Sequence, residues 1–243
     1  MRIHVLRWSA AVCLAAVVAT AGENPPAKGF DKDGSDPRAI ELADEVMERM
    51  GGRSAWDNTE CLAWTIFGRS HVWDRHTGDY RMETDTSVVI MNLKSGEGRS
   101  WERGSVLAGE EHDVAIRRAR SVWINDSYWL VMPYKLKDSG VTLHYGGETV
   151  TEDGRAADML ELTFTSVGET PDNKYQVCVD RESGLVSQWA YFRTRNDEEP
   201  RFVLPWNDWN RYGDIQLSSG RGRFDVTEIS VTRCADAGVF DRP

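Results

Sequence analysis

Short runs of alternating apolar and polar residues, bounded by turn residues, constrain the fold of this chain more than any other feature. Leu62, Trp64 and Ile66 fall on one face of an extended chain, and Tyr80 and Met82 fall on one face of a later run. Successive side chains of a strand point to opposite faces of its sheet, so a period of two predicts strands with one buried face.

The same pattern predicts further strands along most of the chain, at residues 88–93, 100–103, 141–145, 159–167, 175–180, 185–194, 215–217 and 224–232. Turn residues separate these runs, among them Gly78-Asp79, Gly146-Gly147 and Asp153-Gly154. Because consecutive strands with short connections pair side by side, the sequence predicts an antiparallel meander.

Two segments have helical spacing instead. Asp36 is suited to cap a helix with Pro37 at its first position, and apolar residues then recur at helical spacing as far as Met50. From about 110 to 136 the pattern is again helical, and Asn125 or Asp126 is suited to cap a second short helix. This helix is apolar nearly all round, so we expect it to be buried against the sheet. The predicted fold class is α+β, mainly antiparallel.

The first 21 residues have the features of an export signal. Two arginines precede an apolar run that ends in Ala19-Thr20-Ala21, the small-x-small form that signal peptidase accepts. The run is about a dozen residues, shorter than the roughly 20 that a membrane-spanning helix needs. We expect cleavage before Gly22 and a periplasmic or secreted protein with no stable membrane span; an uncleaved anchor and lipidation at Cys13 are the alternatives.

Composition suggests four parts: a signal peptide over 1–21, a flexible leader over 22–35, a single domain over 36–234 and a tail over 235–243. The formal net charge is −10, and it becomes −12 once Arg2 and Arg7 are removed with the signal. Nucleic-acid partners and anionic membrane surfaces need concentrated basic charge, so we expect neither.

Three cysteines remain after cleavage, namely Cys61, Cys178 and Cys234. Disulfides persist outside the cytoplasm, and Cys61 and Cys234 lie at the two ends of the predicted sheet. A bridge between them and three isolated buried thiols are both consistent with the sequence.

The sequence contains few motifs that indicate metal binding or catalysis. The segment Asp31–Asp36 hints at a calcium loop, but its glycine lies two positions too early for an EF-hand. His71 and His76 have poor spacing for one metal, and no Gly-x-Ser-x-Gly elbow is present. We therefore expect no enzyme, no metal site and no cofactor.

Three segments resemble those of uncharacterised exported bacterial proteins in the lipoprotein-carrier-like superfamily, to which the LolA and LolB periplasmic carriers belong. They are VWDRHTGDYRMET at 72–84, YWLVMPYKLKDSGV at 128–141 and YQVCVDRESGLVSQWAY at 175–191. The resemblance covers roughly residues 37–233. It implies a curved half-barrel sheet, an N-terminal helix, short helices that plug the concave face, and an apolar cavity that could receive acyl chains.

The leading hypothesis is a carrier or sensor that holds a lipid or another hydrophobic molecule between the sheet and the helix around Trp129. Ligand pockets are lined mainly by apolar and aromatic residues. The candidate ligand-binding residues are Trp64, Tyr80, Met82, Trp101, Trp129, Met132, Trp189 and Tyr191. The alternative is an envelope protein-interaction or structural module with a filled core. For the segment 205–224, a head-group-binding rim and a loop that packs its own aromatics both stay open.

Overall fold

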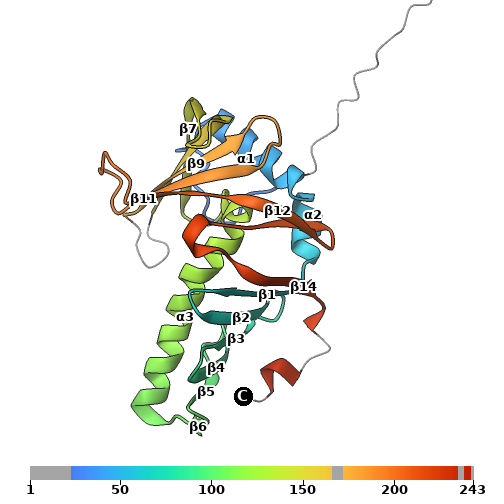
Figure 1. The fold of residues 1–243 in the computed structure, drawn as a ribbon, viewed down its shortest axis with the longest axis vertical. Helices are drawn as coiled ribbons and strands as arrows, with labels where there is room; N and C mark the ends of the chain where they lie inside the picture. The colour runs from blue at the N-terminus through green and yellow to red at the C-terminus, as the bar shows by residue number, and fades with distance from the viewer. Residues whose placement is uncertain (1–22, 166–171, 235–237, 242–243) are drawn as a thin grey trace, which may run out of the picture.

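The structure is a computed structural model that describes residues 23–165, 172–234 and 238–241. Its strands form two larger antiparallel sheets and one hairpin (Figure 1). The first, sheet A, has seven strands in the order β14-β1-β2-β3-β4-β5-β6. Their bounds are β14 Thr227–Thr232, β1 Cys61–Ile66, β2 Arg69–Asp74, β3 Asp79–Glu83, β4 Ser87–Asn92, β5 Gly98–Glu102 and β6 Ser105–Val106.

The second sheet, sheet B, has five strands in the order β11-β10-β9-β8-β7. Their bounds are β11 Phe202–Pro205, β10 Val186–Phe192, β9 Lys174–Asp180, β8 Ala156–Phe164 and β7 Val141–Val150. A separate hairpin is formed by β12 (Asn207–Tyr212) and β13 (Ile215–Gly220). Neither larger sheet closes on itself. Sheet B is an antiparallel meander, and sheet A is one from β1 to β6 with β14 added beside β1, so the predicted α+β, mainly antiparallel fold class is confirmed.

The helices lie between and beside the sheets. Near the N-terminus are α1 (Pro37–Arg49) and α2 (Gly52–Asn58), and the long helix α3 (Gly109–Val131) continues into the 3-10 turn η1 (Met132–Lys135). Two more 3-10 turns are η2 (Gly222–Phe224) and η4 (Gly238–Phe240). Helix α3 runs from the β6 end of sheet A toward sheet B (Figure 1).

One local expectation was wrong, and the structure adds detail to two others. Asn125 and Asp126 do not cap a second helix, because α3 continues through both and Asp126 is fully buried. The segment 205–224, for which a head-group-binding rim and a loop that packs its own aromatics were both open, contains the β12–β13 hairpin, and head-group binding there stays a prediction. The stretch 23–35, expected to be a flexible leader, is hydrogen bonded to the chain near β7, for example from Asp31 N to Val141 O at 3.0 Å.

A two-residue turn at Phe67-Gly68 joins β1 to β2 and was missed from the sequence. Both residues have positive φ, 53° and 70°, as the turns that suit a two-residue hairpin require. Glycine adopts this conformation freely, whereas phenylalanine does so at a cost. The Phe67 ring meets Trp129 edge-on with centroids 5.1 Å apart, and this contact accompanies the strained backbone.

The buried side chains form two unequal clusters. The main cluster fills the space between sheet B, α1, the C-terminal half of α3 and strand β1. The second is much smaller and lies between β3, β4 and the N-terminal half of α3, with Tyr80, Met82, Val89, Met91, Leu93 and Ala119 buried. Among these buried residues, only Ala119 comes from α3.

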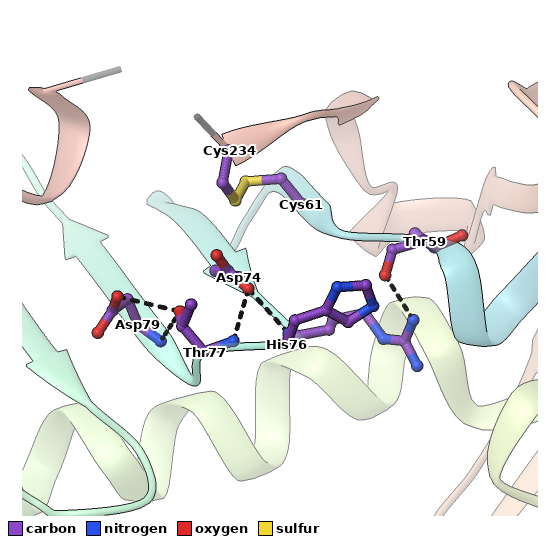
Figure 2. The surroundings of a disulfide bond; sticks show 8 residues. Thr59, Cys61, Asp74, His76, Thr77, Asp79 and Cys234 are labelled. Carbon is purple, nitrogen blue, oxygen red and sulfur yellow. Dashed lines mark hydrogen bonds between the residues drawn. A yellow bond between two sulfur atoms is a disulfide. The ribbon is translucent and has the colours of Figure 1, made fainter. Parts of the chain in front are cut away.

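A disulfide joins Cys61 at the start of β1 to Cys234 after β14 (Figure 2). It spans 173 residues of sequence and ties together the first strand and the last strand of the fold. Beside it, Asp74 Oδ1 accepts hydrogen bonds from the backbone N of His76 and of Thr77, both at 2.8 Å, which shapes the β2–β3 turn (Figure 2). Of the two alternatives for these cysteines, the structure contains the bridge.

The remaining mature cysteine, Cys178, is 5 % exposed, and burial raises the pKa of its thiol to about 11. We expect alkylation of the native mature protein at pH 8 to label essentially no thiol, because the thiolate is the reactive form. Unfolding without reductant should expose one thiol, and unfolding with reductant should expose three. Mass spectrometry counts the labels, Cys178→Ser is the control, and three labels without reductant would contradict the bridge.

Candidate ligand-binding groove

The structure separates the eight candidate ligand-binding residues. Trp64, Trp129, Met132 and Trp189 lie in the main cluster, and Tyr80 and Met82 lie in the second. Tyr191 is half-buried on sheet B, with ring centroids 5.3 Å from Tyr175 and 5.2 Å from Phe202. Trp101 lies on β5 and is 8 % exposed. Their contact with a ligand stays a prediction.

Trp129 and Trp189, two of the candidate ligand-binding residues, pack directly on each other. Their ring centroids lie 4.9 Å apart with the planes nearly perpendicular, and Trp189 meets Trp206 in the same way at 5.2 Å. Edge-to-face pairs at these distances are a favourable aromatic arrangement. A ligand cavity around Trp129 stays a prediction.

A groove lies elsewhere, between sheet A and the N-terminal half of α3. Its volume is about 340 Å³. We call it the α3 groove, and it is lined by Arg69, Met82, Thr84, Thr86, Ser87, Val89, Trp101, Glu102, Leu107, Glu111, Val114, Ala115, Arg118 and Val122. Two candidates from the sequence, Met82 and Trp101, therefore share a groove.

The apolar wall of the groove comes from three strands and one helix. Met82, Val89 and Trp101 come from the neighbouring strands β3, β4 and β5, while Val114 and Val122 come from α3. Val114 is 48 % exposed, so the wall reaches the surface of the protein. The spacing of 114, 118 and 122 places three lining residues on one face of the helix and could have been found from the sequence.

Helix α3 is fixed to sheet A in its C-terminal half by a buried ionic network. Asp126 is fully buried and accepts two hydrogen bonds from Arg69, from Nε at 2.7 Å and from Nη2 at 3.0 Å. His71 Nε2 lies 3.1 Å from Asp126 Oδ2, and His71 Nδ1 lies 2.8 Å from the Tyr80 hydroxyl. Burial alone would raise the pKa of Asp126, but hydrogen bonds from His71, Arg69 and Asn125 outweigh it and lower that pKa.

A second contact fixes the C-terminal end of α3. Arg221 is fully buried and donates from Nε and Nη2 to the carbonyl oxygen of Trp129, at 3.2 and 2.8 Å. Its Nη1 donates to Ser218 Oγ at 2.7 Å, and its guanidinium carbon lies 3.3 Å from the centre of the Trp206 ring. Carbonyls in the last turn of a helix lack intrahelical partners, so this arginine caps α3.

The N-terminal half of α3 has fewer anchors. His112 Nδ1 lies 2.8 Å from Ser100 Oγ, Arg120 donates to the carbonyl oxygen of Leu93 at 2.6 Å, and Ala119 is buried. Helix α3 thus has its buried ionic and capping contacts from Asp126 onward. Before Asp126 it contacts sheet A through side chains that include Ile116 and Trp123, and the Trp123 ring meets that of Trp73 edge-on at 5.2 Å. The groove lies along this less anchored half.

The described residues contain no group of three or more His, Cys, Asp or Glu side chains that could hold a metal ion. Among the same residues, no helix is both long enough and apolar enough to span a membrane.

No protein-family model matches the chain, and no curated protein matches it. Among solved structures, it is similar to a DUF1329 family protein from Desulfovibrio piger, with a TM-score of 0.43, 13% identity and coverage of 85% of this chain and 98% of that chain. It is also similar to MucB, with a TM-score of 0.28, 14% identity and coverage of 83% of this chain and 62% of MucB. A third neighbour is an uncharacterised conserved protein from Thermus thermophilus, with a TM-score of 0.28 and 11% identity, over 85% of this chain and 94% of that one. At such low identities and scores, the likeness carries no functional argument.

Proposed function

We propose that the mature chain is an exported, non-enzymatic protein that binds a lipid or another apolar molecule in the α3 groove, as a carrier or sensor. The observation that carries this proposal is a groove to which seven of the fourteen lining residues contribute apolar side chains. Its volume of about 340 Å³ falls at the low end of the roughly 300–1,000 Å³ range of small-molecule sites.

The apolar part of the lining can contact an acyl chain. Met82, Val89, Leu107 and Val122 offer aliphatic and thioether surface, and Trp101 adds an aromatic face. Burying apolar surface stabilises a complex by roughly 25 cal/mol for each Å². Methionine adapts its shape to different partners, which suits binding of a flexible chain.

Export is supported by two features. The N-terminal segment has the form of a cleavable signal, and the Cys61–Cys234 disulfide is typical of proteins outside the cytoplasm. The LolA- and LolB-like resemblance implies the same compartment and an apolar ligand.

We expect Val114→Asp to weaken binding of a dansyl-labelled fatty acid to the mature protein by at least about tenfold. The carboxylate would stand in the apolar wall and would have to lose water when an acyl chain binds. Val114 is 48 % exposed, so the folded state should tolerate the change. Fluorescence titration measures the affinity.

The matched control is Val150→Asp. Val150 lies on β7, is 67 % exposed and is not part of the α3 groove. The same substitution there should leave fatty-acid affinity within about twofold of the wild type. Equal losses of fatty-acid affinity in both variants, or no loss in Val114→Asp, would contradict binding in the α3 groove.

The filled aromatic interior favours a second candidate, a protein-interaction module of the cell envelope. One solved neighbour, MucB, has also been crystallised in complex with MucA(peri). Native mass spectrometry of the mature protein, purified from the periplasm without detergent and followed by organic extraction, separates the two functions. A stoichiometric lipid adduct supports the carrier, whereas a protein with no adduct and no affinity for added fatty acids supports the interaction module.

A further inference from the structure

Four charged side chains line the α3 groove, and the two signs lie in different halves of it. The four are Arg69, Glu102, Glu111 and Arg118. Helix α3 is hydrogen bonded to β5 through His112 and to β2 through Asp126. Glu102 lies on β5 and Glu111 directly precedes His112, so both acids lie in the β5 half of the groove. Arg69 lies on β2, in the opposite half.

Arg69 is held in one orientation and keeps one donor free for a ligand. Its Nε and Nη2 donate to the carboxylate of Asp126, at 2.7 and 3.0 Å. Its Nη1 makes no hydrogen bond with any residue that the structure describes, and this atom is open to solvent. The side chain is 26 % exposed. Because Asp126 orients the guanidinium before a ligand binds, Arg69 loses little conformational freedom on binding.

Arg118 supplies a second positive charge, and this one has no carboxylate partner. It is exposed and lies on α3 seven residues after Glu111, about 10 Å along the helix axis. Within residues 23–165, 172–234 and 238–241 it forms no ion pair and no side-chain hydrogen bond. Helical spacing places it on the same face as Val114 and Val122, both part of the apolar wall. Its charge is therefore available to a ligand whose chain lies on that wall.

The β3–β4 turn adds hydroxyl groups to the groove. Thr84 Oγ1 accepts the backbone N–H groups of Thr86 and Ser87, at 3.3 and 3.0 Å. The Thr86 hydroxyl itself has no hydrogen-bond partner in the described part of the chain, so it can donate to a ligand. The turn follows β3, the neighbour of β2, and therefore lies toward Arg69, whereas Ser87 pairs across β4 and β5 with Glu102.

We propose that the α3 groove selects fatty acids by their charge, with the carboxylate beside Arg118 on the side of Arg69. This inference rests on the proposed function and adds the head group of the ligand and its direction. The free donors are Arg69 Nη1, the Arg118 guanidinium and the Thr86 hydroxyl, and hydrogen bonds from a cation to a carboxylate are strong. Glu102 and Glu111 repel a carboxylate in the β5 half, so one direction is favoured.

Most of the apolar wall lies where this direction places the acyl chain. Val114 and Ala115 precede Arg118 on α3, and Val89 lies on β4, next to β5. Leu107 follows β6, at the edge of the sheet beyond β5. A chain that starts at Arg118 and runs toward β5 therefore contacts apolar side chains from the helix and from the sheet.

The test compares decanoate, decan-1-ol and decyltrimethylammonium, which share one chain length and differ in charge, below the concentrations at which micelles form. The ¹³C-methyl resonance of Met82, which lines the groove, reports binding to the mature protein. Decanoate should bind at least about tenfold more tightly than decan-1-ol, and the cation should bind most weakly. Equal affinities, or tighter binding of the cation, would overturn charge selection and leave an apolar site in the groove. No shift of Met82 with any of the three would contradict the proposed function as well.

Two variants locate the carboxylate. Arg118→Gln should lower decanoate affinity at least about fivefold and leave decan-1-ol affinity within about twofold, because only the charged head group loses a partner. The matched control, Arg117→Gln, removes an exposed arginine at the preceding position of α3, outside the groove, and should preserve the preference for decanoate. Equal effects of the two substitutions, or equal losses for decanoate and decan-1-ol in Arg118→Gln, would overturn the position of the carboxylate.

Discussion

Replacing Asp126 with alanine is expected to lower the free energy of unfolding by about 3–5 kcal/mol, the usual cost of breaking a buried ion pair from one side. Asp126 accepts two hydrogen bonds from Arg69, faces His71 and is fully buried. Without it, the Arg69 guanidinium loses its carboxylate and the C-terminal half of α3 loses its attachment to β2. Urea unfolding followed by circular dichroism measures the change.

The matched control is Asp113→Ala, which removes a carboxylate at a less buried position of the same helix. Its effect should be within about 0.5 kcal/mol of zero. A loss in Asp126→Ala no larger than the loss in the control would show that the network does not hold α3.

The same network makes a prediction about pH. The pKa of Asp126 is lowered in the folded protein, so its contribution is complete above the usual carboxylate pKa of about 4 and is lost as pH falls through the lower folded value. We therefore expect the stability difference between wild type and Asp126→Asn to be constant near neutral pH and to shrink below about pH 4. Urea titrations at a series of pH values measure it, and a difference that grows as pH falls would contradict the assignment.

Replacing Arg221 with methionine is expected to destabilise the protein by about 2–4 kcal/mol. Methionine keeps much of the apolar volume but leaves the carbonyl oxygens of Trp129, Ser218 and Gly220 without the donors that Arg221 supplies. Buried acceptors without partners cost about 1–3 kcal/mol each, and relief from burying the charge offsets part of this.

Arg223→Met is the control for that substitution. Arg223 is exposed, lies two residues further along the same segment, and has its guanidinium carbon 4.7 Å from the centre of the Phe224 ring. It should change the free energy of unfolding by less than about 1 kcal/mol. Equal effects at the two positions would mean that capping of α3 by Arg221 contributes nothing measurable.

The strands were predictable where one face is buried, because burial imposes the alternation. Tyr80 and Met82 are buried in the same cluster, as their period of two predicts. Strand β2 was harder to recognise, because a histidine, His71, is buried there, and its partners Asp126 and Tyr80 lie far along the chain or on another strand. Residue type alone predicts a surface position for a histidine or an aspartate; only the fold supplies the partners that allow burial.

Long-range partners also explain why Asp126 was wrongly predicted to cap a helix and why the role of Arg221 was not predicted. Asp126 is a favoured capping residue by type, yet its side chain binds Arg69, which is 57 positions away in sequence. Arg221 lies between Gly220 and Gly222, a setting that the sequence presents as a turn. Its partner, the Trp129 carbonyl oxygen, is 92 positions away. Long-range polar contacts leave no local pattern.

The apolar and aromatic character of the candidate site could be predicted from the sequence, but its location in the fold could not. The sequence indicates abundant aromatic surface, and most of it fills the interior, as with Trp129 and Trp189. The groove is formed by smaller residues on α3, such as Ala115 and Val122, opposite Met82 and Trp101. A groove forms where the facing side chains are small. Which side chains face each other depends on how the helix and the strands are arranged, and this arrangement cannot be read from the local sequence.

The proposed function depends on a helix that is clamped at one end and open at the other. Asp126 and Arg221 hold the C-terminal half of α3, and the α3 groove lies along the other half, whose polar contacts come from His112 and Arg120. An apolar ligand should therefore perturb residues near β3 and β5 and leave the aromatic interior unchanged.

The most direct test is a titration of the mature protein with palmitate, followed through ¹³C-methyl methionine resonances. The six mature methionines report on different places: Met82 lines the α3 groove, while Met132 lies in the main cluster. We predict a saturable shift of the Met82 methyl resonance and little change at Met132. A shift at Met132 without one at Met82, or no shift at any methionine, would contradict binding in the α3 groove.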